Sequence, residues 1–353
     1  MKVRLGDYIK EYSVRNKTNE EIPVYSVTNS NGFCRDYFTK EIASKNKTTY
    51  KIVPKGYFAY NPSRINVGSV DWQRFEDKVI VSPLYNVFSV SNELNQQYLY
   101  YFLKSAKTVQ RIKAVATGSV RDNLKLEMLY EFPIELLKMP EQCFIVDNLD
   151  RVQRVISLRK KELEGLDCLI KARFVEMFED PVSNSRGLPE ATLPEMGVFG
   201  RGVSKHRPRN DPKLLGGRYP LIQTGDVSAA DLYILSYSGT YSDLGLAQSK
   251  MWDKGTLCIT IAANIAKTAI LNFDACFPDS VVGFMANEKT NNIYIHYWFS
   301  FFQRILEAQA PESAQKNINL KTLSEIKVIC PAKDEQDVFA AFVNQVDKSK
   351  VVA

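Results

Sequence analysis

The sequence predicts an α/β (α+β) fold with two globular domains that are related by an internal duplication. A long helix separates the domains, and a short second helix ends the chain. Two observations support this prediction: the run from Pro140 to Asp180 has the apolar spacing of one helix, and the segments on either side of it share a residue pattern. The composition agrees, because 353 residues with 45% hydrophobic and 24% charged side chains suit two globular domains.

The long helix carries apolar side chains at alternating steps of three and four residues, or their sum, which places them on one seam. These side chains are Ile145, Leu149, Val152, Ile156, Leu163, Leu166, Ile170 and Met177. Pro140 favours a first helical turn, and Pro181 ends the helix. At about 1.5 Å per residue the helix is roughly 55–60 Å long, which indicates a coiled-coil spacer.

Segments about 195 residues apart match each other in the same order along the chain, which indicates a duplicated unit. The matches pair Lys55-Gly56 with Lys254-Gly255, Tyr98–Phe102 with Tyr294–Trp298, Asn123–Ile134 with Asn317–Val328, and Glu141-Gln142 with Glu335-Gln336. The expected domains are 1–139 and 188–331, with the spacer helix at 140–180, a linker at 181–187 and the C-terminal helix at 332–353.

Each copy shows the same order of expected elements, several short strands followed by an amphipathic helix. In the first copy we expect strands at 22–27, 56–60, 79–81 and 85–90 and a helix at 96–115. In the second copy we expect strands at 219–223, 256–261, 269–273 and 281–285 and a helix at 292–308.

The six cysteines are scattered without a CxxC pair, and the chain has only two histidines, so we expect neither a metal site nor a cofactor. Reduced thiols suit a cytoplasmic protein. The polar N-terminal segment does not resemble a secretion signal, and no apolar run approaches the roughly 18 residues of a membrane span.

Several motifs in this order resemble the specificity subunit of type I restriction–modification systems, over essentially the whole chain. They are Val81–Tyr85, Gly118–Leu124, Phe199–Arg209, Tyr219–Val227 and Gly255-Thr256. The resemblance implies two target-recognition domains, each reading one half of a bipartite double-stranded DNA site, and no catalysis by this subunit. It also implies helices that dock methylation subunits using S-adenosylmethionine, joined in complete systems by restriction subunits. The complex would then be a DNA adenine methyltransferase and endonuclease. The alternative is a two-domain scaffold that binds proteins and not DNA.

In the second domain, six cations lie within eighteen residues of glycine- and proline-containing sequence, opposed only by Asp211. They are Arg201, Lys205, Arg207, Arg209, Lys213 and Arg218, accompanied by His206. Such a flexible basic loop can neutralise phosphates and place an arginine on guanine, or it can be a solvated loop without a partner. Further candidates for DNA contact are Gln223, Thr224, Asn264 and Lys267, although the first two could merely close a turn.

The first domain has a more diffuse set of cations, of which Arg35, Lys45 and Lys47 are the candidates for DNA contact. Lys51 belongs to the same group. The run Tyr60-Asn61-Pro62-Ser63-Arg64 follows a strand, where asparagine and arginine could read adenine and guanine, or Asn61-Pro62 could simply form a turn.

Asn61-Pro62 is also similar to the Asn/Asp-Pro-Pro-aromatic loop of amino-methyltransferases. Ser63 and Arg64 stand where that loop has proline and an aromatic residue, and the chain has no GxGxxG or P-loop motif. We therefore expect no methyltransferase activity in this chain.

The second copy of the helix is short, because only Asp337–Ala353 follows Glu335-Gln336. Its apolar residues are Val338, Phe339, Phe342, Val343 and Val346. Since the first copy runs for about 40 residues from the equivalent point, we expect part of the seam to be covered by another chain. That chain would be a second copy of this protein or a methylation subunit.

Overall fold

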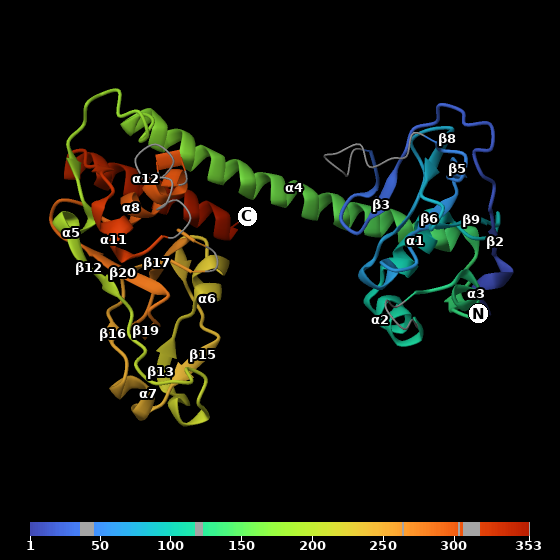
Figure 1. Cartoon of the computed structure of the whole chain (residues 1–353). Coiled ribbons are helices and arrows are strands. Elements are labelled where there is room, and N and C mark those ends of the chain that lie inside the picture. Colours follow the sequence, from blue (N-terminus) through green and yellow to red (C-terminus); the bar gives the residue numbers. More distant parts are fainter. Residues whose placement is uncertain (36–45, 117–122, 263–264, 303, 306–317, 353) are drawn as a thin grey trace. The chain divides into compact units, whose positions relative to one another are not determined.

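The computed structural model describes residues 1–35, 46–116, 123–262, 265–302, 304–305 and 318–352. The chain forms two compact units, Met1–Ser157 and Leu158–Ala353. The long helix α4 (Met139–Phe178) contributes its N-terminal part to the first unit and its C-terminal part to the second (Figure 1). The predicted uninterrupted helix is therefore confirmed.

The described residues of the first unit form an antiparallel four-stranded sheet and three two-stranded sheets. In sheet order, the large sheet contains β2 (Ile9–Glu11), β9 (Asn86–Val90), β6 (Phe58–Tyr60) and β7 (Val70–Trp72). The small sheets pair β1 (Lys2–Arg4) with β10 (Pro133–Glu135), β3 (Ser26–Thr28) with β4 (Gly32–Cys34), and β5 (Lys51–Pro54) with β8 (Lys78–Val81). The helices are α1 (Gln96–Lys104), α2 (Ala106–Val115) and α3 (Leu126–Tyr130), with 3₁₀ turns η1 (Leu5–Asp7) and η2 (Ile65–Val67).

In the second unit, the part of the chain that the structure describes forms a five-stranded sheet, a four-stranded sheet and one two-stranded sheet. The five-stranded sheet has the order β12 (Gly197–Arg201), β20 (Val281–Ala286), β17 (Leu257–Thr260), β18 (Thr268–Leu271) and β14 (Tyr233–Ile234). The four-stranded sheet has the order β15 (Gly239–Tyr241), β13 (Leu215–Leu221), β19 (Ala275–Cys276) and β16 (Met251–Trp252), and β11 (Glu190–Ala191) pairs with β21 (Val328–Ile329). The helices are α5 (Leu193–Met196), α6 (Thr224–Ala229), α7 (Asp243–Ala247), α8 (Asn292–Trp298), α11 (Leu320–Glu325) and α12 (Lys333–Val352), with 3₁₀ turns η3 (Pro212–Leu214) and η4 (Phe299–Phe301).

The single helix expected at 96–115 is instead two helices that meet at Ser105. This residue has an extended backbone, with φ −63° and ψ 144°. Its hydroxyl accepts the Thr108 N–H and donates to the Phe102 carbonyl at 2.8 Å, so it ends α1 and caps α2. In the second copy the predicted helix at 292–308 is described only in part, as α8 followed by η4.

Two predicted strands also differ from the structure. The expected strand at 22–27 is reduced to β3, which begins at Ser26. The strand expected at 219–223 is β13, which ends at Leu221 because Gln223 is the N-cap of α6.

The duplication is confirmed by equivalent hydrogen bonds in the two units. Gln142 and Gln336 are both completely buried, and each donates to the carbonyl of the residue five positions before it. Asn95 and Asn291 are the N-caps of α1 and α8, and each side chain accepts an N–H three residues further on. The same buried amide therefore locks the start of α4 and of α12 to its own domain.

α12 covers the last turns of α4. Phe339 makes edge-to-face contacts with Phe174 and Phe178, with ring centroids 5.4 and 5.7 Å apart. At the other end of this contact, Lys350 forms an ion pair with Asp167 at 2.6 Å. Phe174 and Phe178 flank the seam that the heptad spacing predicted, and they carry much of the packing. Of the expected apolar face of α12, Phe339, Val343 and Val346 are buried, whereas Val338 is 56% exposed.

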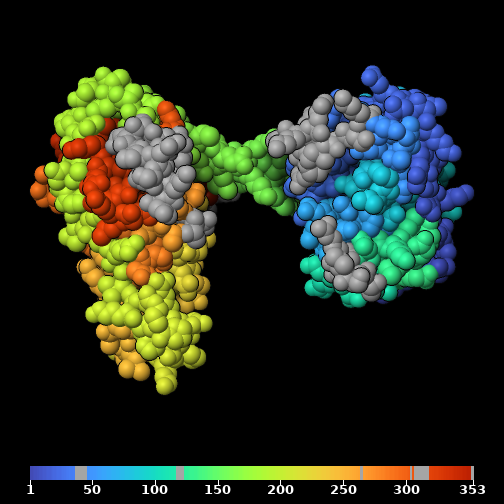
Figure 2. All heavy atoms as spheres, viewed as in Figure 1, coloured from blue at the N-terminus to red at the C-terminus, as the bar shows by residue number. Residues whose placement is uncertain are grey.

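The middle of α4 keeps its apolar seam at the surface, as the sequence predicted. Leu149 and Leu163 are each 38% exposed, Val152 is 54% exposed and Ile156 is 43% exposed. These four residues are hereafter the bare seam. In the space-filling view this stretch of α4, coloured green, lies at the surface (Figure 2).

His296 makes the second unit sensitive to acid. Its Nδ1 lies 3.0 Å from Thr268 Oγ1, and burial, assisted by the charge of Lys350, lowers its pKa to about 4. The unfolded chain takes up a proton near pH 6.5 and the folded chain does not, so stability is complete above pH 6.5 and falls towards pH 4. Between pH 7 and pH 5, we expect the free energy of unfolding of the natural chain to drop by roughly 1–2 kcal/mol more than that of the His296→Gln variant. Denaturant titrations at the two pH values test this, and identical drops would contradict it.

Candidate nucleic-acid interface

Three loops of the second unit leave the five-stranded sheet at one end. The register pairs Arg201, the last residue of β12, with Val282, and Thr260, the last residue of β17, with Val281 at the start of β20. The described residues at 202–211, 261–262, 265–267 and 277–280 therefore lie together. We call this the cationic sheet end, because it carries the basic loop and Lys267.

The start of the basic loop is held by specific contacts. Gln248 Oε1 accepts the backbone N–H groups of Lys205 and His206 at 2.6 and 3.0 Å. Ser249 Oγ donates to the Val203 carbonyl at 2.7 Å. These contacts fix the start of the loop against the segment that precedes β16.

The loop has more acidic partners than Asp211. Asp279 pairs with both Arg207 and Arg209, and Arg218 lies 3.7 Å from Asp243. The expectation that Asp211 alone opposes the cluster is therefore wrong, because distant segments bring two further carboxylates to it.

Asp211 itself belongs to the local turn. Its carboxylate lies 3.1 Å from His206 Nε2, and its pKa is lowered chiefly by the Lys213 N–H that it accepts and further by His206. Arg201 and Lys205 are exposed and have no ion pair among the described residues. These two side chains are the cations most available to an anionic ligand.

The other candidates of the second domain divide between structural and exposed positions. Gln223 closes the turn into α6, since its N–H donates to Asp226 Oδ2 at 2.8 Å, and Thr224 is the first residue of that helix. Lys267 is exposed at the cationic sheet end, where its N–H donates to Thr260 Oγ1 at 3.0 Å. Asn264 lies outside the described residues.

In the first domain, Tyr60 does not present its side chain to a ligand. It is completely buried, donates to the Leu124 carbonyl at 3.1 Å and accepts from Asn86 Nδ2 at 2.8 Å. Burial raises the pKa of its hydroxyl far above the usual value. The expectation that Tyr60 contacts DNA is therefore wrong, because its side chain belongs to the core.

Asn61 forms the turn that the sequence allowed. Its Oδ1 accepts the Ser63 N–H at 3.0 Å, and its carbonyl accepts the N–H groups of Arg64 and Ile65. Asn61 is half-buried in this turn, whereas the Arg64 side chain is exposed.

The cations of the first domain differ in how far they reach the surface. Arg35 is exposed, and Lys47 is half-buried. Lys51 is buried, and its ammonium donates to the Tyr85 carbonyl at 2.7 Å, with a pKa that burial lowers. Lys51 therefore supports the fold instead of extending the basic surface, and Lys45 lies outside the described residues.

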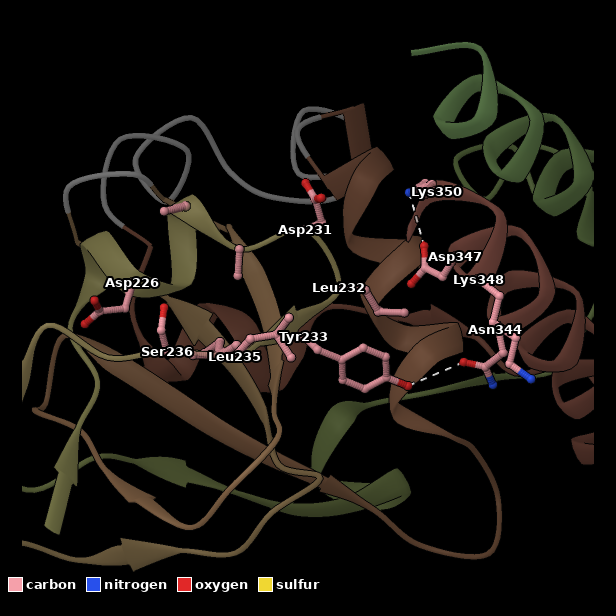
Figure 3. A pocket seen from close by; sticks show the side chains of 13 residues that line it. Asp226, Asp231, Leu232, Tyr233, Leu235, Ser236, Asn344, Asp347, Lys348 and Lys350 are labelled. Carbon is pink, nitrogen blue, oxygen red and sulfur yellow. Dashed lines mark hydrogen bonds and ion pairs between the residues drawn. The ribbon is translucent and has the colours of Figure 1, made fainter. Parts of the chain in front are cut away.

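An open groove of about 720 Å³ runs between α12 and the segment 226–236 (Figure 3). Tyr233 donates to Asn344 Oδ1 at 3.5 Å across it, and Lys350 pairs with Asp347 at 3.2 Å. Its acidic side chains offset its lysines, so the groove lacks the excess positive charge of a phosphate-binding surface. In the described ranges there is no group of three potential metal ligands. A membrane span needs a long apolar helix, and the described part of the chain contains none.

Comparison with known proteins matches both copies to one family. Residues 2–167 and 197–351 each match the type I restriction modification DNA specificity domain. The fold resembles a solved structure described as "Structural basis underlying complex assembly and conformational transition of the type I R-M system", with 17% identity, a TM-score of 0.55 and coverage of 100% of this chain and 91% of that one.

A second solved structure, the type I restriction-modification system S subunit from M. genitalium, has 16% identity and a TM-score of 0.53, covering 99% of this chain and 90% of that one. At these identities the structural likeness concerns the fold, whereas the family match covers most of the sequence. The chain belongs to the family of type I restriction–modification DNA specificity domains and carries two of them.

Proposed function

We propose that this chain is the sequence-specific DNA-binding subunit of a type I restriction–modification complex. Each domain reads one half of a bipartite double-stranded site. The observation that carries the proposal is that the chain carries two copies of a DNA specificity domain joined through one long helix, and that one copy presents a cationic sheet end.

In the second domain, Arg201, Lys205, Arg209 and Lys267 contact phosphates, because they are exposed cations at one end of a sheet. Base contacts come from Asn264, whereas Gln223 and Thr224 form the turn into α6. His206 and Arg207 hold the loop.

In the first domain the corresponding contacts come from Asn61, Arg64, Arg35, Lys45 and Lys47. Arg64, which is exposed, and Asn61 suit base edges, since arginine pairs with guanine and asparagine with adenine. The three other cations suit phosphates.

The domains are the segments 1–139 and 188–331, and the helices between and after them dock other subunits. Methylation subunits bind along α4 and α12 and supply the chemistry with S-adenosylmethionine, and restriction subunits join the complete system. The bare seam supports this, because it offers a partner helix a row of apolar side chains. This chain itself acts in recognition and not in catalysis.

A protein-binding scaffold without DNA affinity is the competing function. Titration of the full chain with a random-sequence duplex at increasing salt separates the two. A DNA-binding subunit loses affinity linearly in log K against log salt. A scaffold shows no binding at any salt concentration.

Modularity gives a sharper test. Exchanging residues 188–331 for the second domain of another family member is expected to change one half of the methylated site and leave the other half intact. Each domain has its own hydrophobic core, and a buried glutamine at the start of the following helix, Gln142 or Gln336, joins it to that helix. The exchange therefore leaves residues 1–139 undisturbed. Methylome sequencing of a host that expresses the complex gives the site directly. A change in both halves would contradict two independent readers.

A further inference from the structure

Asp279 holds two arginines of the basic loop with its two carboxylate oxygens. Oδ2 lies 3.5 Å from Arg207 Nη2, and Oδ1 accepts a hydrogen bond from Arg209 Nη2. The carboxylate side chain is 34% exposed, and the arginines are 54% and 45% exposed. A DNA phosphate would bind the same two guanidinium groups in a similar way, because it also presents charged oxygens to planar donors.

The position of Asp279 is fixed by its backbone. Val281 N–H donates to the Pro278 carbonyl at 3.0 Å, and Ile261 N–H donates to the Ser280 carbonyl at 3.0 Å. Gly202 passes so close to this turn that an added Cβ would lie 2.2 Å from the Phe277 carbonyl oxygen. The carboxylate is thus placed against the basic loop by the sheet.

The two arginines differ in how firmly they are held. Arg207 Nη1 also donates to the carbonyls of Ser204 and His206, at 2.6 and 2.9 Å. Among the described residues, Asp279 is the only side-chain partner of Arg209. If the ion pairs with Asp279 were broken, Arg207 would therefore stay in place through its carbonyl partners. Arg209 would become free to pair with another anion.

The first domain lacks this carboxylate. Pro83 and Pro278 each lie three residues before the equivalent strands β9 and β20, so Leu84 stands where the second domain has Asp279. Leu84 is 78% exposed and offers no charge. The feature is thus specific to the second domain.

We propose that Asp279 restrains sequence-independent DNA binding by the second domain, occupying Arg209 as an internal substitute for a phosphate. A duplex gains the Arg209 contact only where its backbone is placed to displace the carboxylate. Non-target DNA, held loosely, leaves the pair closed. This inference rests on the proposed DNA-recognition function and concerns how that function discriminates.

The test compares Asp279→Asn with Asp253→Asn in the full chain, using a random-sequence duplex as the probe. Both substitutions remove one negative charge, but Asp253 precedes β17 at the opposite end of the sheet. We expect Asp279→Asn to bind roughly two to five times more tightly than the control, as the release of an exposed ion pair implies. The slope of log K against log salt should steepen by about 0.9, one additional phosphate contact.

Arg209→Ala identifies the route of the effect. In that background Asp279→Asn should produce no gain over Asp253→Asn, because Arg207 keeps its two carbonyl partners. A gain that persists without Arg209, or an Asp279→Asn variant that binds no more tightly than the control, would overturn the proposal. If neither the natural chain nor Asp279→Asn binds the duplex at any salt concentration, the proposed function fails, and this inference fails with it.

Discussion

The double variant Ile156→Glu and Leu163→Glu is expected to convert an associating chain into a monomer. The two side chains belong to the bare seam and are 43% and 38% exposed, so the substitutions leave the folded core untouched. Burying a complete side chain of this type contributes roughly 1.5–3 kcal/mol, and a half-exposed one about half of that. Losing two of them and burying two charges should weaken association on the order of 100-fold.

Sedimentation velocity of the full chain at micromolar concentration measures this change. Leu235→Glu with Leu244→Glu is the matched control, because these leucines are 74% and 63% exposed but lie outside α4. The control should associate like the natural chain. A natural chain that sediments as a clean monomer at tens of micromolar would remove the basis for a partner on this seam. The same conclusion follows if the control and the seam variant behave alike.

The long helix could be predicted because its signal is local and repeated. Apolar residues at steps of three and four over forty residues leave few alternatives to a helix with one exposed seam. The break at Ser105 could not be predicted from the same periodicity, because the amphipathic pattern continues across it. The break depends on the Ser105 hydroxyl, which accepts the Thr108 N–H. The preference of serine for the N-cap position is the one sequence feature that indicates a new helix here.

The cations of the candidate interface could be located from the sequence, but their neutralisation could not. Asp279 lies 72 residues from Arg207 and 70 from Arg209, and only the pairing of β12 with β20 brings them together. For Tyr60 the sequence-based prediction assigned a ligand contact to a side chain that is buried. Its position at the end of a strand suggested exposure, yet an aromatic ring at the last position of β6 remains inside the core.

Removing the cations of the basic loop is expected to flatten the salt dependence of DNA binding by about 3 units of slope. The variant replaces Arg201, Lys205, Arg207 and Arg209 by alanine. Four positive charges disappear, but Asp279 already offsets one of them. Each net charge that neutralises a phosphate contributes about 0.9 to the slope of log K against log salt. Four cations without Asp279 would give a change in slope of roughly 3–4 units. The expected change is smaller because Asp279 offsets one of the four charges.

A control that removes three cations elsewhere in the second unit separates this local effect from net charge. Lys254, Lys289 and Lys321 are exposed, and the first two lie near the opposite end of the five-stranded sheet. Their replacement by alanine should weaken binding slightly and change the slope by less than about one unit, because charges beyond a Debye length of about 10 Å are screened. Equal slopes for both variants would mean that DNA does not contact the cationic sheet end. An unchanged slope in the basic-loop variant would assign this loop to protein contacts.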